Sequence, residues 1–546
     1  MLYALLASFP IVFCLLSMSI LKWKGVVSIS VSLLISIILA IFVWQLKFID
    51  IIQYAINGIL EVSNIILIIF GAILLLNILI KSGAMDIINN SFNNISEDSR
   101  IHLLLIGLAF NTFLNGIAAF GTEVVLSSLV LISLGFPSFP AAIVSLAFNA
   151  PFITFGAVGI PTITAITLTQ SLAQEAGLDV VQYANLVATY SAFLHSIAGM
   201  FLTVIILFLV IKIFAKEKSW KPFFEIIPFA LLNSAIMYAS YYFSAKYLGP
   251  DLPTVIAGIV GLISVIFTTK LKILLPKTVW KFPANAKIWD LDKNIQHKKT
   301  VAPTIQKNLG KLKVWLPYII VSAILILSRI KGLWLQDFFK SRVLHIEHLF
   351  GLEKVNYDFL WLYSPGIMPF LFVSLIFIVV FHLSSKDIKS VFIDTWHQAK
   401  LAALAIVLSV MMVSIMLKST NNPLGLQGML VSIAGLISYL KGVGVIIITP
   451  FIGALGTFIS GSNTTSNILF SITSFNTASI INIPPYILVA LSSVGGGAGI
   501  MFAFKNLLIV ASVIGLKNKE GHMLNYMLLI SIVYILIILG VVFITI

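Results

Sequence analysis

A run of seven small or polar residues, GSNTTSN, occupies positions 461–467 and stands between two apolar stretches, PFIGALGTFIS and ILFSITSF. Polar groups inside hydrocarbon are tolerated only where protein or a water-filled cavity surrounds them. The run therefore predicts a buried site that offers hydroxyl, amide and backbone N–H groups to a small anion. The alternative is packing alone, because small residues let membrane helices approach and their hydroxyls can hydrogen-bond between helices.

Three further stretches interrupt apolar sequence with glycine, proline and asparagine: TFLNGIAAFGTE at 112–123, FNAPFITFGAVGIPT at 148–162 and SSVGGGAGIMFAFKN at 492–506. The four stretches form two pairs in the same order, roughly 340 to 350 residues apart, as in transporters built from structural repeats. Each pair predicts a re-entrant hairpin followed by a helix that is unwound at 149–161 or at 493–500. We call the two predicted hairpin ends the first tip (residues 115–123) and the second tip (residues 461–467).

Few charged residues lie within apolar sequence, and each is a candidate functional residue. Glu123, at the end of the first tip, is flanked by long apolar runs. A carboxylate in such surroundings tends to bind a proton, so Glu123 could take up and release one as the site changes access. The alternative is an ordinary solvated carboxylate at the membrane surface. Lys505 could neutralise a buried carboxylate, or its ammonium could extend to the lipid headgroups.

Two other ionisable residues are weaker candidates. Lys418 is expected to end a span, with a position on the substrate path as the alternative. His195 could relay protons, although a hydrogen bond between helices is the simpler role for a single histidine near the start of a span.

The composition places these residues in a bilayer. Hydrophobic residues make up 59% of the 546 residues and charged residues 10%, and the mean hydropathy is +1.07. Apolar runs of about 20 residues, long enough to cross the hydrocarbon core, recur along the whole chain. We expect about 12 to 16 membrane segments, because several segments are short or interrupted. The first apolar run lacks the features of a cleavable signal and is expected to remain in the protein.

The formal charge of +14 is concentrated in loops. Eleven lysines fall within residues 269–314: Lys270, Lys272, Lys277, Lys281, Lys287, Lys293, Lys298, Lys299, Lys307, Lys311 and Lys313. Such clusters mark the cytoplasmic side of a membrane protein. Binding of phosphate or RNA is the alternative, but neither interleaved aromatic residues nor a glycine cradle accompanies the lysines. The single cysteine, Cys14, excludes disulfides and cysteine-ligated metal sites.

At these interruptions the sequence resembles the L-lactate permease family. The most specific stretches are FLNGIAAFGTEV (113–124), LGFPSFPAAIVSLAFNAPFITFGAVGIPT (134–162), PFIGALGTFISGSNTTSNILF (450–470) and VIGLKNKEG (513–521). Matching residues are Gly116, Ala118, Phe120 and Gly121 in F-L-E-G-A-A-G-F-G, then Asn149, Pro151, Phe155, Gly156, Ala157, Gly159, Ile160 and Pro161, and finally Gly461, Ser462, Thr464, Ser466 and Asn467 in G-S-D-T-S-S-N. The triplet Ser462-Asn463-Thr464 also looks like the tip signature of a wider ion-transporter superfamily, which implies two hairpins and an elevator-like movement.

Three departures from the family pattern concern charge. Asn115 stands where the pattern has Glu, Asn463 where it has Asp, and Ile500 where it has Lys. In addition, FAFKN replaces a run that bears Ser, Pro and Gln. Glu123 and Lys505 are the residues that could supply the missing charges from neighbouring positions.

The predicted fold is an all-α polytopic membrane protein with two structural repeats, each with a re-entrant hairpin and a discontinuous helix. Residues 1–268 form the N-terminal half, with a hairpin near 105–136 and a broken helix near 140–165. Residues 269–314 form a basic cytoplasmic loop. Residues 315–546 form the C-terminal half, with a hairpin near 445–481 and a broken helix near 485–516.

The resemblance implies a secondary active transporter that imports L-lactate or a related 2-hydroxymonocarboxylate, such as glycolate, with protons across a prokaryotic plasma membrane. The predicted substrate-binding residues are Asn115, Gly116, Gly121, Asn149, Gly156, Ser462, Asn463, Thr464, Asn467, Gly496 and Lys505, and Glu123 is the predicted proton carrier. The expected partners are a small monocarboxylate anion, protons or sodium ions, and the lipid bilayer, with a homodimer as one option for the assembly. No nucleic acid, cofactor or resident metal is expected.

The main alternative is a sodium-coupled carrier of the same architecture for another small organic or inorganic anion, since neutral oxygens at broken helices can coordinate Na⁺. A passive channel would be distinguished by its conductance. A membrane enzyme is disfavoured because the chain lacks paired catalytic groups. His345 and His348 flank Glu347 in HIEH, but three residues in a predicted exterior loop make a weak zinc motif.

Overall fold

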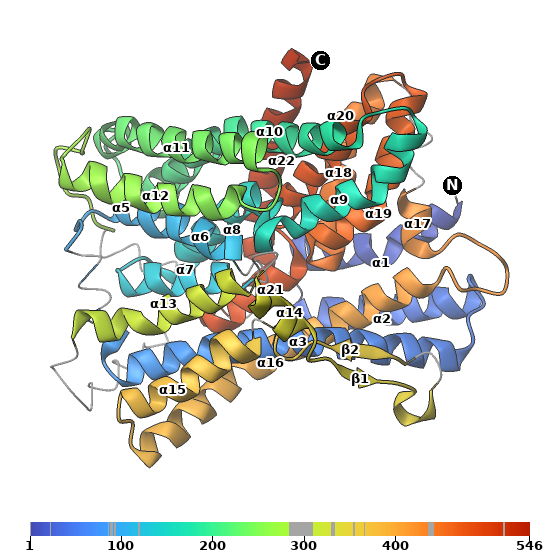
Figure 1. Cartoon of the computed structure of the whole chain (residues 1–546), viewed down its shortest axis with the longest axis horizontal. Coiled ribbons are helices and arrows are strands. Elements are labelled where there is room, and N and C mark those ends of the chain that lie inside the picture. Colours follow the sequence, from blue (N-terminus) through green and yellow to red (C-terminus); the bar gives the residue numbers. More distant parts are fainter. Residues whose placement is uncertain are drawn as a thin grey trace.

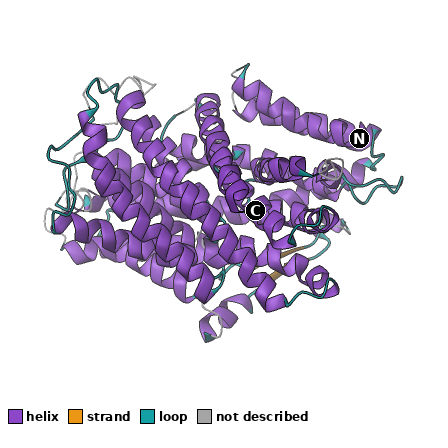
Figure 2. Cartoon of the chain, turned by 90° about the horizontal axis from the view of Figure 1, so that it is seen from above, coloured by secondary structure: helices purple, strands orange, loops and turns teal. Residues whose placement is uncertain are grey.

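The computed structural model describes the chain except for residues 1, 22, 24, 86, 88–90, 92–93, 118–120, 283–309, 329–332, 353–354, 365, 435–441, 517–518 and 546. Helices make up most of the described chain (Figure 1). This follows from the composition, because a backbone inside hydrocarbon must satisfy its own N–H and C=O groups and a helix does so within one segment. Figure 2 shows the same helices from above, with many of the loops gathered at the two ends of the molecule.

Six helices of the described chain are long and apolar enough to cross a membrane: Val180–Phe214, Lys221–Leu248, Pro253–Lys270, Val443–Ser460, Pro485–Val513 and Glu520–Thr545. Seven shorter apolar helices of 10–17 residues accompany them: Leu2–Cys14, Val26–Phe42, Phe48–Leu60, Glu123–Ser133, Ser138–Ile153, Leu312–Val321 and Ile367–Val380. The chain is therefore a multi-pass helical membrane protein. The total of 12 to 16 embedded segments stays a prediction, because some of those segments are short or interrupted.

The N-terminal half contains a series of long helices and several short ones. Their bounds are α1 Leu2–Ser19, α2 Gly25–Phe42, α3 Phe48–Lys81, α5 Ser99–His102, η1 Leu103–Phe110, α6 Asn111–Ile117, α7 Thr122–Ser133, α8 Ser138–Ile153, α9 Gly156–Glu175, α10 Val180–Phe208, η2 Leu209–Phe214, α11 Lys221–Leu248 and α12 Pro253–Lys270. Helices α10, α11 and α12 lie side by side along the upper edge of Figure 1.

The C-terminal half adds a second set of helices and one small antiparallel sheet. The bounds are α13 Lys311–Leu327, α14 Trp334–Lys340, β1 Leu344–Ile346, η4 Leu349–Gly351, β2 Tyr357–Phe359, η5 Gly366–Phe372, α15 Val373–Val380, α16 Ser385–Lys418, α17 Met429–Ala434, α18 Val443–Ser460, α19 Asn463–Ile480, α20 Pro485–Gly499, α21 Phe504–Val513 and α22 Glu520–Thr545. Strands β1 and β2 pair with Leu344 opposite Phe359. Helix α16 packs against α3 of the other half (Figure 1), and Lys81 forms an ion pair of 3.3 Å with Asp387 beside this contact.

Two helices are interrupted at the centre of the molecule. Helix α8 ends at Ile153 and α9 begins at Gly156. Ala157, the second residue of α9, has a φ of 46°, in the left-handed region. Helix α20 ends at Gly499 and α21 begins at Phe504. Every residue of α8 is buried, and α8 contacts α20. The two breaks are thus enclosed by protein, which is the condition under which irregular backbone persists in a membrane.

The basic segment is described only at its two ends, so Lys287, Lys293, Lys298, Lys299 and Lys307 lie outside the described residues. Its first part is held against the N-terminal half by a buried ion pair. Arg100 Nη2 contacts Asp98 Oδ2 at 2.5 Å, and Arg100 also donates to the carbonyl oxygens of Pro222 and Thr278. The N–H of Trp280 donates to Asp98 at 3.1 Å. These contacts fix where the chain leaves α12.

Candidate functional site

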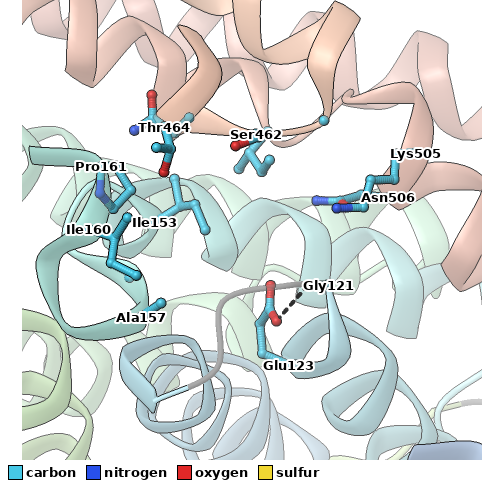
Figure 3. Close-up of a pocket in the computed structure, with 14 residues that line it drawn as sticks. Gly121, Glu123, Ile153, Ala157, Ile160, Pro161, Ser462, Thr464, Lys505 and Asn506 are labelled. Carbon is cyan, nitrogen blue, oxygen red and sulfur yellow. Dashed lines mark hydrogen bonds between the residues drawn. The ribbon is translucent and has the colours of Figure 1, made fainter. Parts of the chain in front are cut away.

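One cavity lies where the two tips meet the two helix interruptions (Figure 3). Its volume is about 70 Å³, whereas a single water needs about 10–15 Å³ on the same measure, so a ligand of several non-hydrogen atoms can enter. The lining residues are Gly121 and Glu123 of the first tip, Ile153, Gly156, Ala157, Ile160 and Pro161 around the first interruption, Gly461, Ser462, Asn463 and Thr464 of the second tip, and Ile500, Lys505 and Asn506 at the second interruption. The structure therefore brings all four polar stretches of the sequence to one place.

Glu123 is fully buried in the first turn of α7, and its carboxylate points toward the cavity (Figure 3). Oε2 accepts a hydrogen bond of 2.9 Å from the N–H of Gly121, and Oε1 accepts one of 3.1 Å from Nδ2 of Asn149. Gly121 has a φ of 94°, which a residue with a Cβ adopts only with strain. The tight turn at Gly121 and the amide of Asn149 together fix the carboxylate at the cavity wall.

Asn115 and Asn149 lie on the side of Glu123 that faces away from the cavity lining, and Asn149 contacts the Glu123 carboxylate. Asn115 Nδ2 donates to the main-chain carbonyl of Asn149 at 3.3 Å and also to its side-chain oxygen. Because that oxygen is engaged, the amide nitrogen of Asn149 is turned to Glu123. Both asparagines were predicted to surround the anion. The structure instead places them in a supporting layer, with neither lining the cavity.

Gly116 does not reach the cavity either. It packs against α12, where a Cβ at Gly116 would lie 2.7 Å from the main-chain nitrogen of Val255. Its small size serves close helix contact, which is the packing alternative for small residues in membranes. Residues Ala118 and Phe120 of the same tip lie outside the described residues.

The second tip joins α18 to α19 through Gly461 and Ser462. Gly461 has a φ of 65°, and Ser462 caps α19 by accepting a hydrogen bond of 3.3 Å from the N–H of Thr465. In the described part of the chain the N–H groups of Asn463 and Thr464 have no acceptor. The N-terminus of an 18-residue helix therefore opens on the cavity. Its free N–H groups and its partial positive charge favour an anion.

The asparagines of the second tip connect it to both halves. Asn463 lines the cavity, and its Nδ2 donates to the carbonyl of Ser493 at 3.2 Å and to Oγ1 of Thr154 at 3.4 Å. Asn467 lies one turn further along α19 and donates to the carbonyl of Pro161 at 2.9 Å and to Oγ of Ser493 at 3.1 Å. Asn467, predicted as a substrate ligand, is thus a structural link behind the cavity.

The glycine-rich stretch of the C-terminal half is helical where it was expected to be unwound. Helix α20 continues through Gly495 and Gly496 to Gly499, and the interruption falls at residues 500–503. Gly496, predicted to bind substrate, does not line the cavity. The amide oxygen of Asn463 occupies the space that a side chain at Gly496 would need. The glycines therefore permit close packing of the second tip on α20.

Lys505 enters the cavity from the first turn of α21 and is only 8% exposed (Figure 3). Its aliphatic stem passes the second tip, since a Cβ at Gly461 would lie 2.8 Å from Cβ and Cδ of Lys505. Within the described chain no hydrogen bond or ion pair holds its ammonium, although the charge of Glu123 attracts it. A buried charge without a close partner is costly, so the cavity favours an anionic ligand.

Several lining residues were not predicted. Asn506 follows Lys505 and shares the cavity, and the apolar part of the wall comes from Ile153, Ile160 and Ile500. Asn506 could have been found from its position beside Lys505. The isoleucines carry no such signal, because they look like any other apolar residue of a membrane helix.

The weaker candidates lie elsewhere. Lys418 is exposed at the end of α16, and His195 is buried in α10 without lining the cavity. His345 is exposed in β1, where Nδ1 lies 2.7 Å from Asp358. Among the described residues no group of three His, Cys, Asp or Glu side chains could hold a metal ion.

An all-helical, multi-pass membrane protein with interrupted helices around a small buried polar cavity has the build of a secondary transporter. The model of the L-lactate permease family matches residues 3–546, and the chain belongs to that family. Because this is a family of permeases, the protein is a transporter and not an enzyme.

Three relatives illustrate the similarity. A putative L-lactate permease of Haemophilus influenzae is 26% identical over 496 residues, which cover 88% of this chain and 86% of the relative. A glycolate permease of Escherichia coli is 28% identical over 548 residues, covering 96% and 92%. The L-lactate permease of Escherichia coli is 26% identical over 545 residues, also covering 96% and 92%.

Proposed function

We propose that the protein imports L-lactate, glycolate or a closely related 2-hydroxymonocarboxylate together with protons across a prokaryotic plasma membrane. The observation that carries the proposal is the buried Lys505 ammonium, which faces the same cavity as Glu123 and the N-terminus of α19. The names of the relatives, lactate and glycolate permeases, support the substrate class.

The cavity offers a partner for each part of such a substrate. The carboxylate is bound by Lys505 and by the N–H groups at the start of α19. The 2-hydroxyl group faces the side-chain amide of Asn506, which can both donate and accept a hydrogen bond. The short carbon chain contacts the isoleucines of the wall. The volume of about 70 Å³ favours two- or three-carbon acids over larger ones.

Two of the three charge departures from the family pattern have a counterpart at the same cavity, whereas Asn463 stays neutral in place of Asp. Ile500 takes the place of a lysine in the pattern, and Lys505 lines the same cavity as Ile500. Asn115 takes the place of a glutamate, and it is joined through Asn149 to Glu123. One cation and one carboxylate are therefore retained at the site, although both come from other positions in the sequence.

Glu123 is the proton carrier in this proposal. Bringing an anionic substrate beside an ionised Glu123 would place two negative charges in one small, buried cavity. Protonation of Glu123 removes this repulsion and leaves Lys505 free for the substrate carboxylate. Proton and substrate are then bound together and released together, which is symport.

The movement that accompanies transport is also part of the proposal. We infer that η1, α6 and α7 form one re-entrant hairpin, that α18 and α19 form the other, and that the two halves are structural repeats. Alternating access then moves the cavity between the two sides of the membrane in an elevator-like manner. The interruptions supply the exposed backbone groups that a transport site needs.

Uptake by the purified protein in lipid vesicles tests the proposal. Labelled L-lactate is supplied with an imposed pH gradient, with the gradient collapsed, and with or without Na⁺, while glycolate, propionate, pyruvate and succinate compete. We expect uptake that depends on the pH gradient, is indifferent to Na⁺, and is inhibited best by glycolate and unlabelled lactate. Absence of uptake above that of empty vesicles would contradict the substrate assignment.

A sodium-coupled carrier of the same architecture is the second candidate. The observation that favours it is a group of buried oxygens without a hydrogen-bond donor in the described chain, namely Oδ1 of Asn463, Oδ1 of Asn467 and Oγ1 of Thr457. Neutral oxygens of this kind suit Na⁺. In the vesicle experiment this candidate predicts uptake that requires Na⁺ and persists after the pH gradient is collapsed.

A further inference from the structure

A chain of buried hydrogen bonds runs from the cavity wall into the body of the protein. It begins at Nδ2 of Asn463, which donates to Oγ1 of Thr154 at 3.4 Å. Thr154 Oγ1 lies 2.8 Å from Nε2 of His195, and Nδ1 of His195 lies 2.7 Å from the hydroxyl of Tyr534. The four residues belong to α19, the α8–α9 interruption, α10 and α22, so the chain connects the two halves of the protein.

All four side chains are buried, and Asn463 alone lines the cavity. Thr154, His195 and Tyr534 are fully buried, and Asn463 is 2% exposed. A neutral imidazole satisfies both contacts in either tautomer, because the hydroxyls of Thr154 and Tyr534 can each donate or accept a hydrogen bond. In both tautomers Oγ1 of Thr154 keeps a lone pair for the amide of Asn463. His195 is therefore held on both sides and in turn orients Thr154.

Gly497 of α20 lies against the hydrogen-bonded side chains of Thr154 and His195. A Cβ at Gly497 would lie 3.0 Å from Cε1 of His195 and 3.0 Å from Oγ1 of Thr154. On the far side, Ser531 of α22 donates to the carbonyl of Ala498 at 3.0 Å. Helices α20 and α22 thus pack on either side of His195, and a side chain at position 497 would collide with the Thr154–His195 pair.

We propose that His195, together with Thr154 and Tyr534, is a positioning residue for the transport site. Thr154 and the carbonyl of Ser493 engage both hydrogens of the Asn463 amide, which fixes this residue and with it the first turn of α19 at the cavity wall. This inference rests on the proposed function of the cavity. A histidine with a purely structural role would form hydrogen bonds only within the core. His195 is instead linked through the hydroxyl of Thr154 to Asn463, which lines the cavity.

The test compares variants that remove single hydroxyl groups from the full-length protein in vesicles. Thr154→Val and Tyr534→Phe are expected to raise the KM for lactate by about 3- to 10-fold, the range for loss of one neutral hydrogen bond, with a smaller change in maximal rate. Thr154→Ser keeps the hydroxyl and restores the KM to within about 2-fold. Tyr183→Phe, which removes a buried hydrogen bond to Thr169 away from the cavity, is the matched control and leaves the KM unchanged.

A double variant separates positioning from general stability. In an Asn463→Ala background the effect of Thr154→Val should disappear, because the group that Thr154 positions is gone. If Thr154→Val instead adds its full effect to that of Asn463→Ala, or if neither Thr154→Val nor Tyr534→Phe changes the KM, the proposal is wrong.

A labelling experiment gives a readout that does not depend on the substrate. Cys14 is the single cysteine and is replaced by alanine, and Thr464→Cys places a thiol in the first turn of α19. Its rate of reaction with a small maleimide should rise about 3- to 10-fold when Thr154→Val or Tyr534→Phe is added, and should not rise with Thr154→Ser. A rise in a protein that does not transport lactate would uphold the positioning role and overturn only the proposed function, whereas an unchanged rate would overturn the positioning role.

Discussion

The two tips meet at one cavity but contribute different electrostatics. The first tip supplies an ionisable carboxyl group, Glu123, which is held by the N–H of Gly121 and the amide of Asn149. The second tip carries no charged residue and supplies the N-terminus of α19 with its Ser462 cap. The formal positive charge, Lys505, comes from α21 and passes over Gly461 of the second tip.

In the function proposed above, this difference separates the two tasks of a coupled carrier. A helix N-terminus attracts an anion at every pH, because its partial charge does not titrate. A carboxylate attracts or repels according to whether it carries a proton. The second tip with Lys505 is thus suited to bind the substrate, and the first tip is suited to make binding depend on a proton.

The largest effect is expected from removal of the cation. Lys505→Gln should lower lactate uptake by about 30-fold to several thousand-fold, because truncating one partner of a buried charged contact costs roughly 2–5 kcal/mol. Initial uptake rates in vesicles measure it. Lys418→Gln, at the exposed end of α16, is the matched control and should stay within about 2-fold of the parent.

Moving the lysine from position 505 to position 500 tests whether the second tip needs a positive charge anywhere on the cavity wall or only at Lys505. The double variant Ile500→Lys, Lys505→Gln places the charge at another residue of the same cavity wall. Uptake should recover by about 10-fold over Lys505→Gln alone, the factor that corresponds to 1.4 kcal/mol. No recovery would mean that Lys505 acts through its position and not through the charge that it brings.

A second strong effect is expected at the first tip. Glu123→Gln keeps the shape of the side chain but cannot bind and release a proton, so uptake should no longer respond to an imposed pH gradient. Counterflow of labelled against unlabelled lactate, which needs no net proton movement, should survive. Glu175→Gln, on an exposed residue at the end of α9, should leave gradient-driven uptake intact. Unchanged dependence on the gradient in Glu123→Gln would remove Glu123 from the mechanism.

A smaller loss is expected when Gly461 of the second tip is replaced. Gly461→Ala places a residue with a Cβ in the left-handed backbone conformation, which costs about 1–2 kcal/mol of conformational free energy. The added Cβ would also collide with the aliphatic stem of Lys505. Uptake should fall by about 10-fold. Gly135 has a φ of 95° but open space around it, so Gly135→Ala has the backbone cost without the collision. Equal effects of the two substitutions on uptake would argue against the contact with Lys505.

The smallest effect is expected at the cap of α19. Ser462→Ala removes an N-cap worth about 1 kcal/mol and leaves the start of the helix less well held beside the cavity, so the KM for lactate should rise by about 5-fold. Ser384, which caps α16 by accepting from the N–H of Asp387, provides the matched control. Ser384→Ala should lower the melting temperature in detergent to a similar degree without changing the KM.

Residue types and their order in the sequence were sufficient for much of the site. Four polar interruptions in apolar sequence located the four stretches that meet at the cavity, because such residues are costly in hydrocarbon unless they face a site. The second break itself falls at residues 500–503 and not at 493–500. Glu123, Lys505 and the SNT triplet at 462–464 were identified in the same way and line the cavity. The helical, membrane-embedded fold class followed from hydropathy alone.

Other residues were misplaced because sequence gives types but not directions. Asn115, Asn149 and Asn467 look like ligands, but they do not line the cavity, and their amide nitrogens donate to Asn149, to Glu123, and to Pro161 and Ser493, respectively. Gly496 looks like part of a break, yet α20 stays helical there, and the absence of a side chain at Gly496 makes room for Asn463. Which polar group faces the cavity depends on how neighbouring helices satisfy its hydrogen bonds.

The sequence by itself determined that this is a multi-pass helical membrane protein with four polar interruptions, one buried carboxylate candidate and one buried lysine candidate. Those properties depend on composition and on local spacing, which do not require knowledge of distant contacts. Only the tertiary structure decided that Ile500 and Lys505 share a wall, that Asn115 acts on Glu123 through Asn149, and that His195 is joined to Asn463 through Thr154. The physical reason is that these relations depend on distances between residues tens to hundreds of positions apart, and those distances are set by the packing of helices from both halves.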